Sequence, residues 1–479
     1  MERLTGLDAS FLYVETPATH MHVSMVAVFD PSTMPGGYSF SKVRDLVESR
    51  LPRIAQFRRR LVRVPFDLHH PVWVEDPDFD LDYHVRRIGV PHPGSIRELC
   101  DVAGDFTGRQ LDRTKPLWEL LVAEGLEGGQ IGLLAKVHHS TIDGVSGAEL
   151  MVHLFDLEPA PAPEEEPETL APERVPTDAE LVAYAVRSRA RQPLLLARAL
   201  LGTARSVANV VRARRRGQGA GMAAPFTAPR TSFNGSVTPH RKVAVANLSL
   251  PEIKEVKRSF GTTVNDVVLA TCAGALRRYL IRRGELPGTP LIAVCPVSVR
   301  SELSDAEGSN QISAFFTSLS TDVADPVERL RAIASATRGA KEEHNAIGAD
   351  MLQNWAEFAA PAVFARASRL YSSMKLADRH RPIHNLVISN VPGPPFPLYL
   401  AGSRLVMLCP LGPVMEGAGL NITVLSYMDS VDVGLIACRE LMPDLRDLAN
   451  DFVDSMDELK KAAAGVSGAG GRAAGTPQL

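Results

Sequence analysis

The residues best suited to chemistry are two adjacent histidines, His138 and His139, which open the stretch HHSTIDG that ends at Asp143 and Gly144. A neutral imidazole accepts protons near neutral pH, so a histidine here can serve as the base that deprotonates a hydroxyl nucleophile. Successive side chains of a strand point to opposite faces, so the two rings would diverge and could not bind one metal ion together. Gly144 permits a backbone turn that a β-carbon would hinder. The pattern predicts a catalytic histidine and no metal site.

A histidine pair alone is weak evidence for catalysis, and the chain contains a second pair. His69 and His70 lie in DLHHPVW, without an aspartate and a glycine at the matching distance, and we interpret them as structural. The four fixed positions of HHxxxDG would arise by chance about once in a thousand chains of this length. The stretch from His138 to Gly144 is therefore the predicted site.

The segments around this stretch must position it, and they predict an α/β (α+β) fold. PLWELLVAEGL and IGLLAKVHH are apolar runs on either side of the turn residues 127–130, which is typical of a hairpin that ends at the histidines. Residues 21–30 form another short apolar run, and Ser39 precedes an amphipathic helical pattern. Strand-like runs continue to residue 438, between helices that begin near Pro251 and Thr263 and before a final helix. We expect mixed sheets flanked by helices.

Changes in composition divide the chain. Residues 1–157 form an N-terminal domain that carries the motif, and residues 236–461 form a second α/β domain. Between them, residues 158–235 begin as a proline- and glutamate-rich linker and continue as an arginine-rich helical stretch, 178–216. That basic stretch is either a solvated crossover or a surface that docks on anionic lipid. Residues 462–479 are rich in glycine and alanine and are expected to be disordered.

Overall composition excludes several classes of protein. With 52 basic and 55 acidic residues, the net charge of -3 argues against general nucleic-acid binding. No apolar run approaches the ~18 residues of a membrane-spanning helix. The five cysteines are scattered without CxxC spacing, which disfavours a disulfide framework or a cysteine-rich zinc site. The first residues lack the pattern of a secretory signal, so we expect a cytoplasmic protein.

HHSTIDG matches the HHxxxDG signature of coenzyme A-dependent acyltransferases with a chloramphenicol-acetyltransferase-like fold, which peptide-synthetase condensation domains share. Further segments make the chain resemble the bacterial wax ester synthase/diacylglycerol acyltransferase family, from the N-terminus to about residue 460. These segments are LTGLDASFLYVETPATHMHV, PLWE, TVNDVVLA, PVSVR, NLVISNVPGP and PLYLAG. The resemblance implies two chloramphenicol-acetyltransferase-like domains with a tunnel at their interface. It also implies acyl transfer from acyl-CoA, a co-substrate rather than a cofactor, to diacylglycerol or a long-chain alcohol.

The resemblance also implies roles for the motif residues. The base of the family is the second histidine, His139, which would return its proton to the departing CoA thiolate. No serine or cysteine nucleophile is needed, so we expect no acyl-enzyme. Asp143 is expected to be architectural, paired with Arg300 at the end of PVSVR, because a guanidinium binds a carboxylate through two hydrogen bonds.

Other candidate residues have two interpretations each. Asn265 and Asp266 either cap a helix or contact the site. Pro116, Leu117 and Trp118 are expected to be packing residues, with acyl-tunnel lining as the alternative. Two further polar residues, Ser389 and Asn390, are candidates for an oxyanion donor that the sequence alone does not place.

Two other functions remain open at this stage. One is acylation of a different hydroxyl lipid, and the other is lipid binding by a catalytically silent, condensation-like module. Its substrates would bring it into peripheral contact with a membrane, at the inner face of the plasma membrane, or with a lipid droplet.

Overall fold

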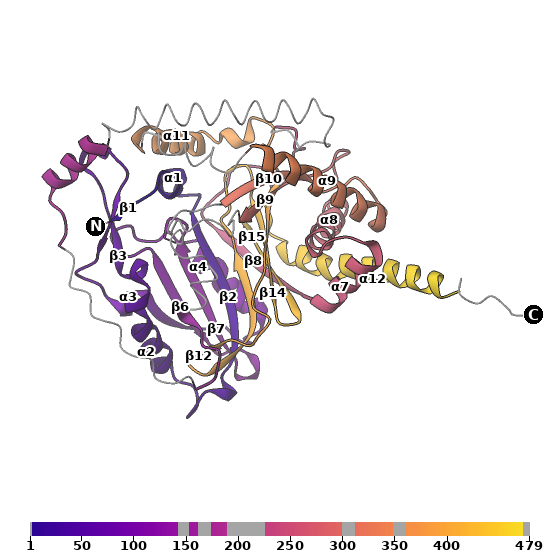
Figure 1. Ribbon diagram of the computed structural model, residues 1–479, viewed down its shortest axis with the longest axis horizontal. Coiled ribbons are helices and arrows are strands. Elements are labelled where there is room, and N and C mark those ends of the chain that lie inside the picture. The colour runs from indigo at the N-terminus through magenta and orange to yellow at the C-terminus, as the bar shows by residue number, and fades with distance from the viewer. Residues whose placement is uncertain are drawn as a thin grey trace, which may run out of the picture.

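The computed structural model of the protein describes residues 2–141, 153–160, 174–188, 226–298, 312–347 and 361–472. Of the predicted site residues, Asp143, Gly144 and Arg300 lie outside these ranges, as does most of the basic stretch beyond residue 188. Two six-stranded mixed sheets and a small three-stranded sheet form the described part (Figure 1). The predicted α/β class with flanking helices is confirmed.

The first sheet has the strand order β12-β13-β2-β7-β6-β5 and carries the histidine pair. β6 (Trp118–Glu124) and β7 (Ile131–His138) form the predicted antiparallel hairpin, joined by a 3-10 turn at Glu127–Gly129. The other members are β2 (His22–Asp30), β5 (Val85–Gly89), β12 (Tyr399–Leu400) and β13 (Ser403–Leu411). β2 and β7 are central strands, so the end of β7 is held from both sides.

Alternating side chains of these central strands pack against helices on the two faces of the sheet. Ala27 and Phe29 of β2 lie in one core cluster with α2 (Phe40–Arg50), whose N-cap is Ser39. Val26 and Val28 lie in another with α4 (Ile96–Thr107), which begins with a Ser95–Glu98 capping box. The strands therefore bury both faces, as a continuous apolar run predicts.

The second sheet has the order β10-β9-β11-β14-β15-β8 and belongs to the C-terminal half. Helices α8 and α12, with α7 and α9, pack against one another and against this sheet away from the first sheet (Figure 1). Its strands are β8 (Arg241–Ser249), β9 (Ile292–Ser298), β10 (Ile312–Ser318), β11 (Leu386–Val391), β14 (Leu420–Tyr427) and β15 (Ser430–Cys438). The helices are α7 (Leu250–Phe260), α8 (Val264–Arg282), α9 (Pro326–Ile347) and α12 (Leu445–Arg472).

Smaller elements complete the described part. The three-stranded sheet consists of β1 (Glu2–Arg3), β4 (Val72–Glu75) and β3 (Arg59–Val62). Helix α1 (Gly6–Val14) packs against α11 (Pro361–Ser373), so an early and a late segment of the chain lie together at one edge of the molecule (Figure 1). A short helix, α3 (Leu81–His84), precedes β5.

Two features depart from the expected organisation. β13 comes from the expected C-terminal domain, yet it pairs antiparallel with β2 in the first sheet, with Leu408 opposite Ala27. The two halves are thus joined through a shared sheet, which boundaries at residues 157 and 236 do not anticipate. In addition, residues 462–472, expected to be disordered, continue helix α12 to Arg472. Alanine-rich sequence at 462–464 favours propagation of an existing helix.

Candidate active site

The histidine pair lies where β7 ends in a tight turn. The last strand residue is His138, and the N–H of Thr141 donates to its carbonyl oxygen at 2.9 Å. The N–H of His139 donates to the carbonyl oxygen of Met21, just before β2, at 2.8 Å. The backbone of His139 is therefore held by the neighbouring strand, which fixes the position from which its side chain leaves the sheet.

The ring of His138 is buried and held within the protein. Its Nδ1 accepts a hydrogen bond from the N–H of Ser140 at 3.1 Å, and the Ser140 hydroxyl lies 2.7 Å from the same nitrogen. Its Nε2 lies 3.7 Å from a carboxylate oxygen of Glu15. The ring is buried, with Nδ1 hydrogen-bonded within the turn and Nε2 facing the Glu15 carboxylate, so His138 organises the turn rather than facing a substrate.

The ring of His139 has different neighbours. It is half-buried and stacks on Phe11 of α1, with ring centroids 4.1 Å apart and an interplanar angle of 22°. Its Nδ1 is buried and has no hydrogen-bond partner among the described residues. Burial, together with the electrostatic influence of the neighbouring His138, lowers the pKa of His139 to about 4. At neutral pH the ring is therefore uncharged and able to accept a proton.

Pro116, Leu117 and Trp118 stand at the start of β6, which pairs with β7, and all three are buried. The indole of Trp118 stacks between the rings of Phe57 and His84, with centroid distances of 4.5 and 4.4 Å. Its N–H donates to the carbonyl oxygen of Phe57 at 2.7 Å. These contacts are those of a packing residue.

Leu117 also belongs to the backbone frame of the turn. It is fully buried, and its carbonyl oxygen accepts the N–H of His138 at 2.9 Å. The segment therefore supports the position of the histidine pair through packing and main-chain contacts.

Asp266 completes the N-terminal cap of α8. Its carboxylate accepts the N–H and the hydroxyl of Thr263 at 2.9 and 2.7 Å, and its other oxygen accepts the hydroxyl of Thr337 at 2.8 Å. Asn265 instead accepts a hydrogen bond from the side chain of Asn390 at 3.2 Å, which brings two predicted residues together. Ser389 lies on β11 opposite Thr423. Within the described ranges, no hydrogen bond links these polar residues to His139.

The second histidine pair has structural contacts. His69 and His70 are buried, and the hydroxyl of Tyr13 lies 2.8 Å from Nδ1 of His70. All five cysteines are buried and free. The described ranges contain no group of three or more histidine, cysteine or acidic side chains arranged to hold a metal ion. They also contain no helix long and apolar enough to cross a membrane.

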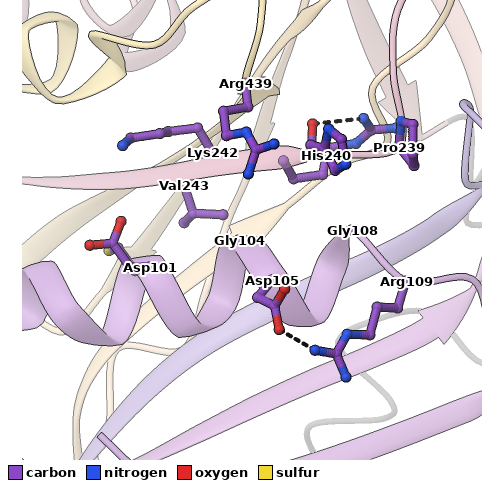
Figure 2. Close-up of a pocket in the computed structure, with 12 residues that line it drawn as sticks. Asp101, Gly104, Asp105, Gly108, Arg109, Pro239, His240, Lys242, Val243 and Arg439 are labelled. Carbon is purple, nitrogen blue, oxygen red and sulfur yellow. Dashed lines mark hydrogen bonds and ion pairs between the residues drawn. The ribbon is translucent and has the colours of Figure 1, made fainter. Parts of the chain in front are cut away.

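A groove of about 490 Å³ lies between α4 and the start of β8, at the contact between the two halves (Figure 2). α4 approaches β8 closely at Gly104, where a Cβ would lie 2.8 Å from a backbone oxygen. Figure 2 shows Asp105 pointing to Arg109, with which it forms an ion pair. Across the groove, His240 pairs with Glu440. The groove contains none of the predicted site residues, and we interpret it as part of the contact between the halves.

The sequence patterns did not predict three residues that lie near the histidines: Phe11, Glu15 and Arg113. Glu15 and Arg113 form a partly buried ion pair beside His138, and Phe11 stacks on His139. They are separated from the motif by between 25 and 128 residues, as the sequence positions show. Phe11 and Glu15 lie within the segment LTGLDASFLYVETPATHMHV, but no spacing rule connects that segment to the histidines.

Comparison with known proteins identifies relatives across nearly the whole chain. A family model described as the wax ester synthase/diacylglycerol acyltransferase catalytic domain matches residues 4–268, and one described as the WS/DGAT C-terminal domain matches residues 308–460. A putative diacylglycerol O-acyltransferase of Mycobacterium tuberculosis H37Rv is 41% identical over 462 residues, covering 96% of this chain and 90% of that protein. A second one from the same strain is 33% identical over 463 residues, covering 97% of each.

Solved structures show the same relationship. The wax ester synthase/diacylglycerol acyltransferase from Marinobacter aquaeolei VT8 matches with a TM-score of 0.68 and 31% identity, covering 97% of this chain and 100% of that one. The first condensation domain of the CDA synthetase matches with a TM-score of 0.54 and 13% identity, covering 97% and 96%. The second likeness shows a shared fold alone.

Proposed function

The chain belongs to the wax ester synthase/diacylglycerol acyltransferase family, and from this premise we propose how its residues carry out the reaction. The protein is an acyltransferase that moves an acyl group to the hydroxyl of a lipid, diacylglycerol or a long-chain alcohol. The products are a triacylglycerol or a wax ester. We propose that the donor is a long-chain acyl-CoA and that His139 is the general base.

In the proposed reaction, the neutral ring of His139 removes the proton of the acceptor hydroxyl as its oxygen attacks the thioester carbonyl. The tetrahedral intermediate collapses, the C–S bond breaks, and the CoA thiolate leaves. The protonated ring then returns its proton to the thiolate, so free CoA departs and His139 is regenerated. The observation that carries this proposal is the uncharged, half-buried ring at the end of β7.

Ser140 offers a competing mechanism, because its hydroxyl lies 2.7 Å from a ring nitrogen of His138. A serine beside a histidine can form an acyl-enzyme. Two observations favour direct transfer instead. Ser140 is only 2% exposed, so a thioester cannot reach its hydroxyl without rearrangement. The same Nδ1 also accepts the backbone N–H of Ser140, so it is poorly placed to remove the hydroxyl proton.

The cysteines are poor alternatives as nucleophiles. All five are buried, and burial raises the pKa of Cys100 and of Cys295 to about 12, so these two remain protonated thiols. Single-turnover reactions with labelled acyl-CoA test the choice of mechanism. We expect no protein-bound label and an active Ser140→Ala variant. A bound acyl group in the wild type that is absent from Ser140→Ala would replace direct transfer with an acyl-enzyme.

Asp143 and Arg300 remain a proposed architectural pair, since both lie outside the described residues. A double-mutant cycle tests the pairing. We expect Asp143→Ala and Arg300→Ala to lose activity together, with the double variant little worse than either single one. Additive losses in folded proteins would exclude the pairing.

We further propose that the enzyme acts in the cytoplasm in peripheral contact with a membrane or lipid droplet. Support comes from α11, whose residues Val363 and Leu370 expose 67% and 58% of their surface, and from Met374 directly after the helix, which exposes 44%. These residues lie at helical spacing along one stripe. Residues 361–375 contain three basic side chains and no acidic one. A helix with an exposed apolar stripe and only basic charges suits an anionic lipid surface.

The position of α11 near the proposed base favours α11 over the basic stretch 178–216 as the lipid-binding surface. α11 packs against α1 (Figure 1), and α1 carries Phe11, whose ring stacks on His139. A lipid surface on α11 would therefore lie on the same side of the molecule as the proposed base. The basic stretch 178–216 is the other candidate, and its residues 189–216 lie outside the described ranges.

Vesicle flotation separates the two surfaces. We expect the Leu370→Glu/Met374→Glu variant to lose binding to vesicles that contain anionic lipid, whereas Val453→Glu on α12 retains it. Val453 is a suitable control because it is also exposed. Loss of binding only on deletion of the basic stretch would move the docking site there. Unchanged binding of both variants would exclude α11.

A further inference from the structure

We propose that Glu15, held by Arg113, is a positioning residue that fixes the ring of His139. The inference rests on the proposed function, because it assigns Glu15 a role only if His139 is the base. It starts from an ion pair that lies beside the histidine turn but contacts the proposed base only through other residues.

The first step is the attachment of Glu15 to helix α1. Glu15 is the C-cap residue of that helix, and its side chain is 3% exposed. Arg113 donates from Nε to the Glu15 carboxylate at 3.0 Å and contacts the same oxygen through Nη2. The same Nη2 donates to the carbonyl oxygen of Leu12 at 2.8 Å, one of the carbonyls that the helix end leaves unpaired. One guanidinium thus binds both the carboxylate and the helix end.

The second step is the contact between Glu15 and His138. Nδ1 of His138 accepts the backbone N–H of Ser140, so in the neutral ring the proton resides on Nε2. That nitrogen points to the Glu15 carboxylate at 3.7 Å, a distance beyond a hydrogen bond at which the attraction is electrostatic. Burial opposes ionisation of Glu15, but His138 and Arg113 outweigh it and lower the pKa of Glu15 to about 2. The carboxylate is therefore charged at every pH at which the enzyme would work.

The third step connects these contacts to the base. Phe11 lies four residues before Glu15, one turn earlier on α1, and its ring stacks on His139. Among the described residues, Nδ1 of His139 has no hydrogen-bond partner, so the described restraints on the ring are stacking and its backbone. Glu15 ties α1 to the turn through His138, and α1 in turn presents Phe11. The Glu15–Arg113 ion pair therefore fixes both the Phe11 ring and the histidine turn, which together hold the side chain of His139.

This geometry predicts a specific kinetic effect. A displacement of a catalytic group by about 1 Å can reduce a rate by ~100-fold. We expect Glu15→Gln, which preserves shape and removes charge, to lower kcat by 10- to 100-fold, because Arg113 and His138 lose their shared partner. The KM for acyl-CoA should stay within about twofold, since none of these residues is placed on a substrate surface.

A matched control separates positioning from general damage. Arg50 and Asp156 form another ion pair in the same half of the protein, with side chains that are 10% and 5% exposed. Asp156→Asn should lower the unfolding temperature to a similar degree as Glu15→Gln, yet leave kcat within about twofold of wild type. Equal loss of kcat in both variants would show that Glu15 is merely structural.

A second measurement uses the His139→Ala background. If Glu15 acts through the base, adding Glu15→Gln should leave the residual rate of His139→Ala unchanged. A further loss of 10-fold or more would contradict the proposal, because the carboxylate would then act independently of His139. If His139→Ala itself retains wild-type activity, His139 is not the general base and the proposed function is wrong in its mechanism, whatever the effect of Glu15→Gln. The two failures are therefore distinguishable.

Discussion

The burial of His139 makes a sharp prediction about the pH dependence of the reaction. A histidine with its ordinary pKa of about 6.5 would be only ~9% neutral at pH 5.5. The pKa of His139 is lowered to about 4, because burial destabilises the charged ring and the electrostatic influence of His138 also disfavours protonation. At pH 5.5 such a ring is ~97% neutral. At pH 5.5 the fraction of His139 in the neutral, reactive form therefore differs about tenfold between a pKa of about 6.5 and one of about 4.

The sign of the effect follows from which form reacts. The neutral ring is the base, so activity is present above the pKa and is lost as the pH falls through it. We expect kcat/KM for the acceptor to be level from pH 8 to about 5 and to be half-maximal near pH 4. An enzyme with an unperturbed base would instead lose half its activity near pH 6.5.

The assay should quantify triacylglycerol directly, by separating labelled product at fixed times across this pH range. An acyl-pantetheine donor provides a control, because it lacks the phosphates of CoA and so cannot contribute their titration. Far-ultraviolet circular dichroism at each pH confirms that the chain stays folded. An acid limb centred near pH 6.5, seen with both donors in folded protein, would refute the environment inferred for His139.

Three further predictions concern residues with a structural role. Trp118→Phe should lower the free energy of unfolding by about 2 kcal/mol, because it removes the indole hydrogen bond and leaves a small cavity. A shift in the preferred acyl length without loss of stability would instead indicate that Trp118 lines the acyl tunnel. Asp266→Ala should lower the free energy of unfolding in urea by ~2 kcal/mol, because it removes the cap of α8 and the hydrogen bond to Thr337, and it should retain kcat. Loss of activity at unchanged stability would instead indicate that Asp266 contacts the active site. Gly104→Ala should lose about 1–3 kcal/mol, because its Cβ would meet a backbone oxygen of β8 at 2.8 Å; a variant as stable as wild type would show that the halves do not pack tightly there.

Local patterns in the sequence predicted the elements that carry the histidines. The hairpin of β6 and β7, the capped helix after Ser39 and the start of α8 just after its N-cap Thr263 all follow from hydrophobic period and capping residues within a few positions. These signals are local because hydrogen bonds of helices and hairpins connect near neighbours in the chain.

The contacts that the sequence did not predict are non-local. β13 joins β2 although some 380 residues separate them, and an apolar strand shows no preference for one partner over another. In the same way, Arg113 meets Glu15 across 98 residues, and nothing in either segment indicates the other. The sequence predicted that the histidine pair follows an apolar strand, and β7 does end at His138, whereas the contacts around the pair depend on how distant segments pack.

The measurement that most directly tests the account is the transfer of a labelled acyl group from long-chain acyl-CoA to diacylglycerol by wild-type, His139→Ala and His92→Ala protein. His92 is exposed and serves as the control histidine. We predict equal triacylglycerol formation by wild type and His92→Ala, and a loss of at least about 100-fold in His139→Ala, as expected for a missing general base. Triacylglycerol formation at the wild-type rate by folded His139→Ala would contradict the central claim.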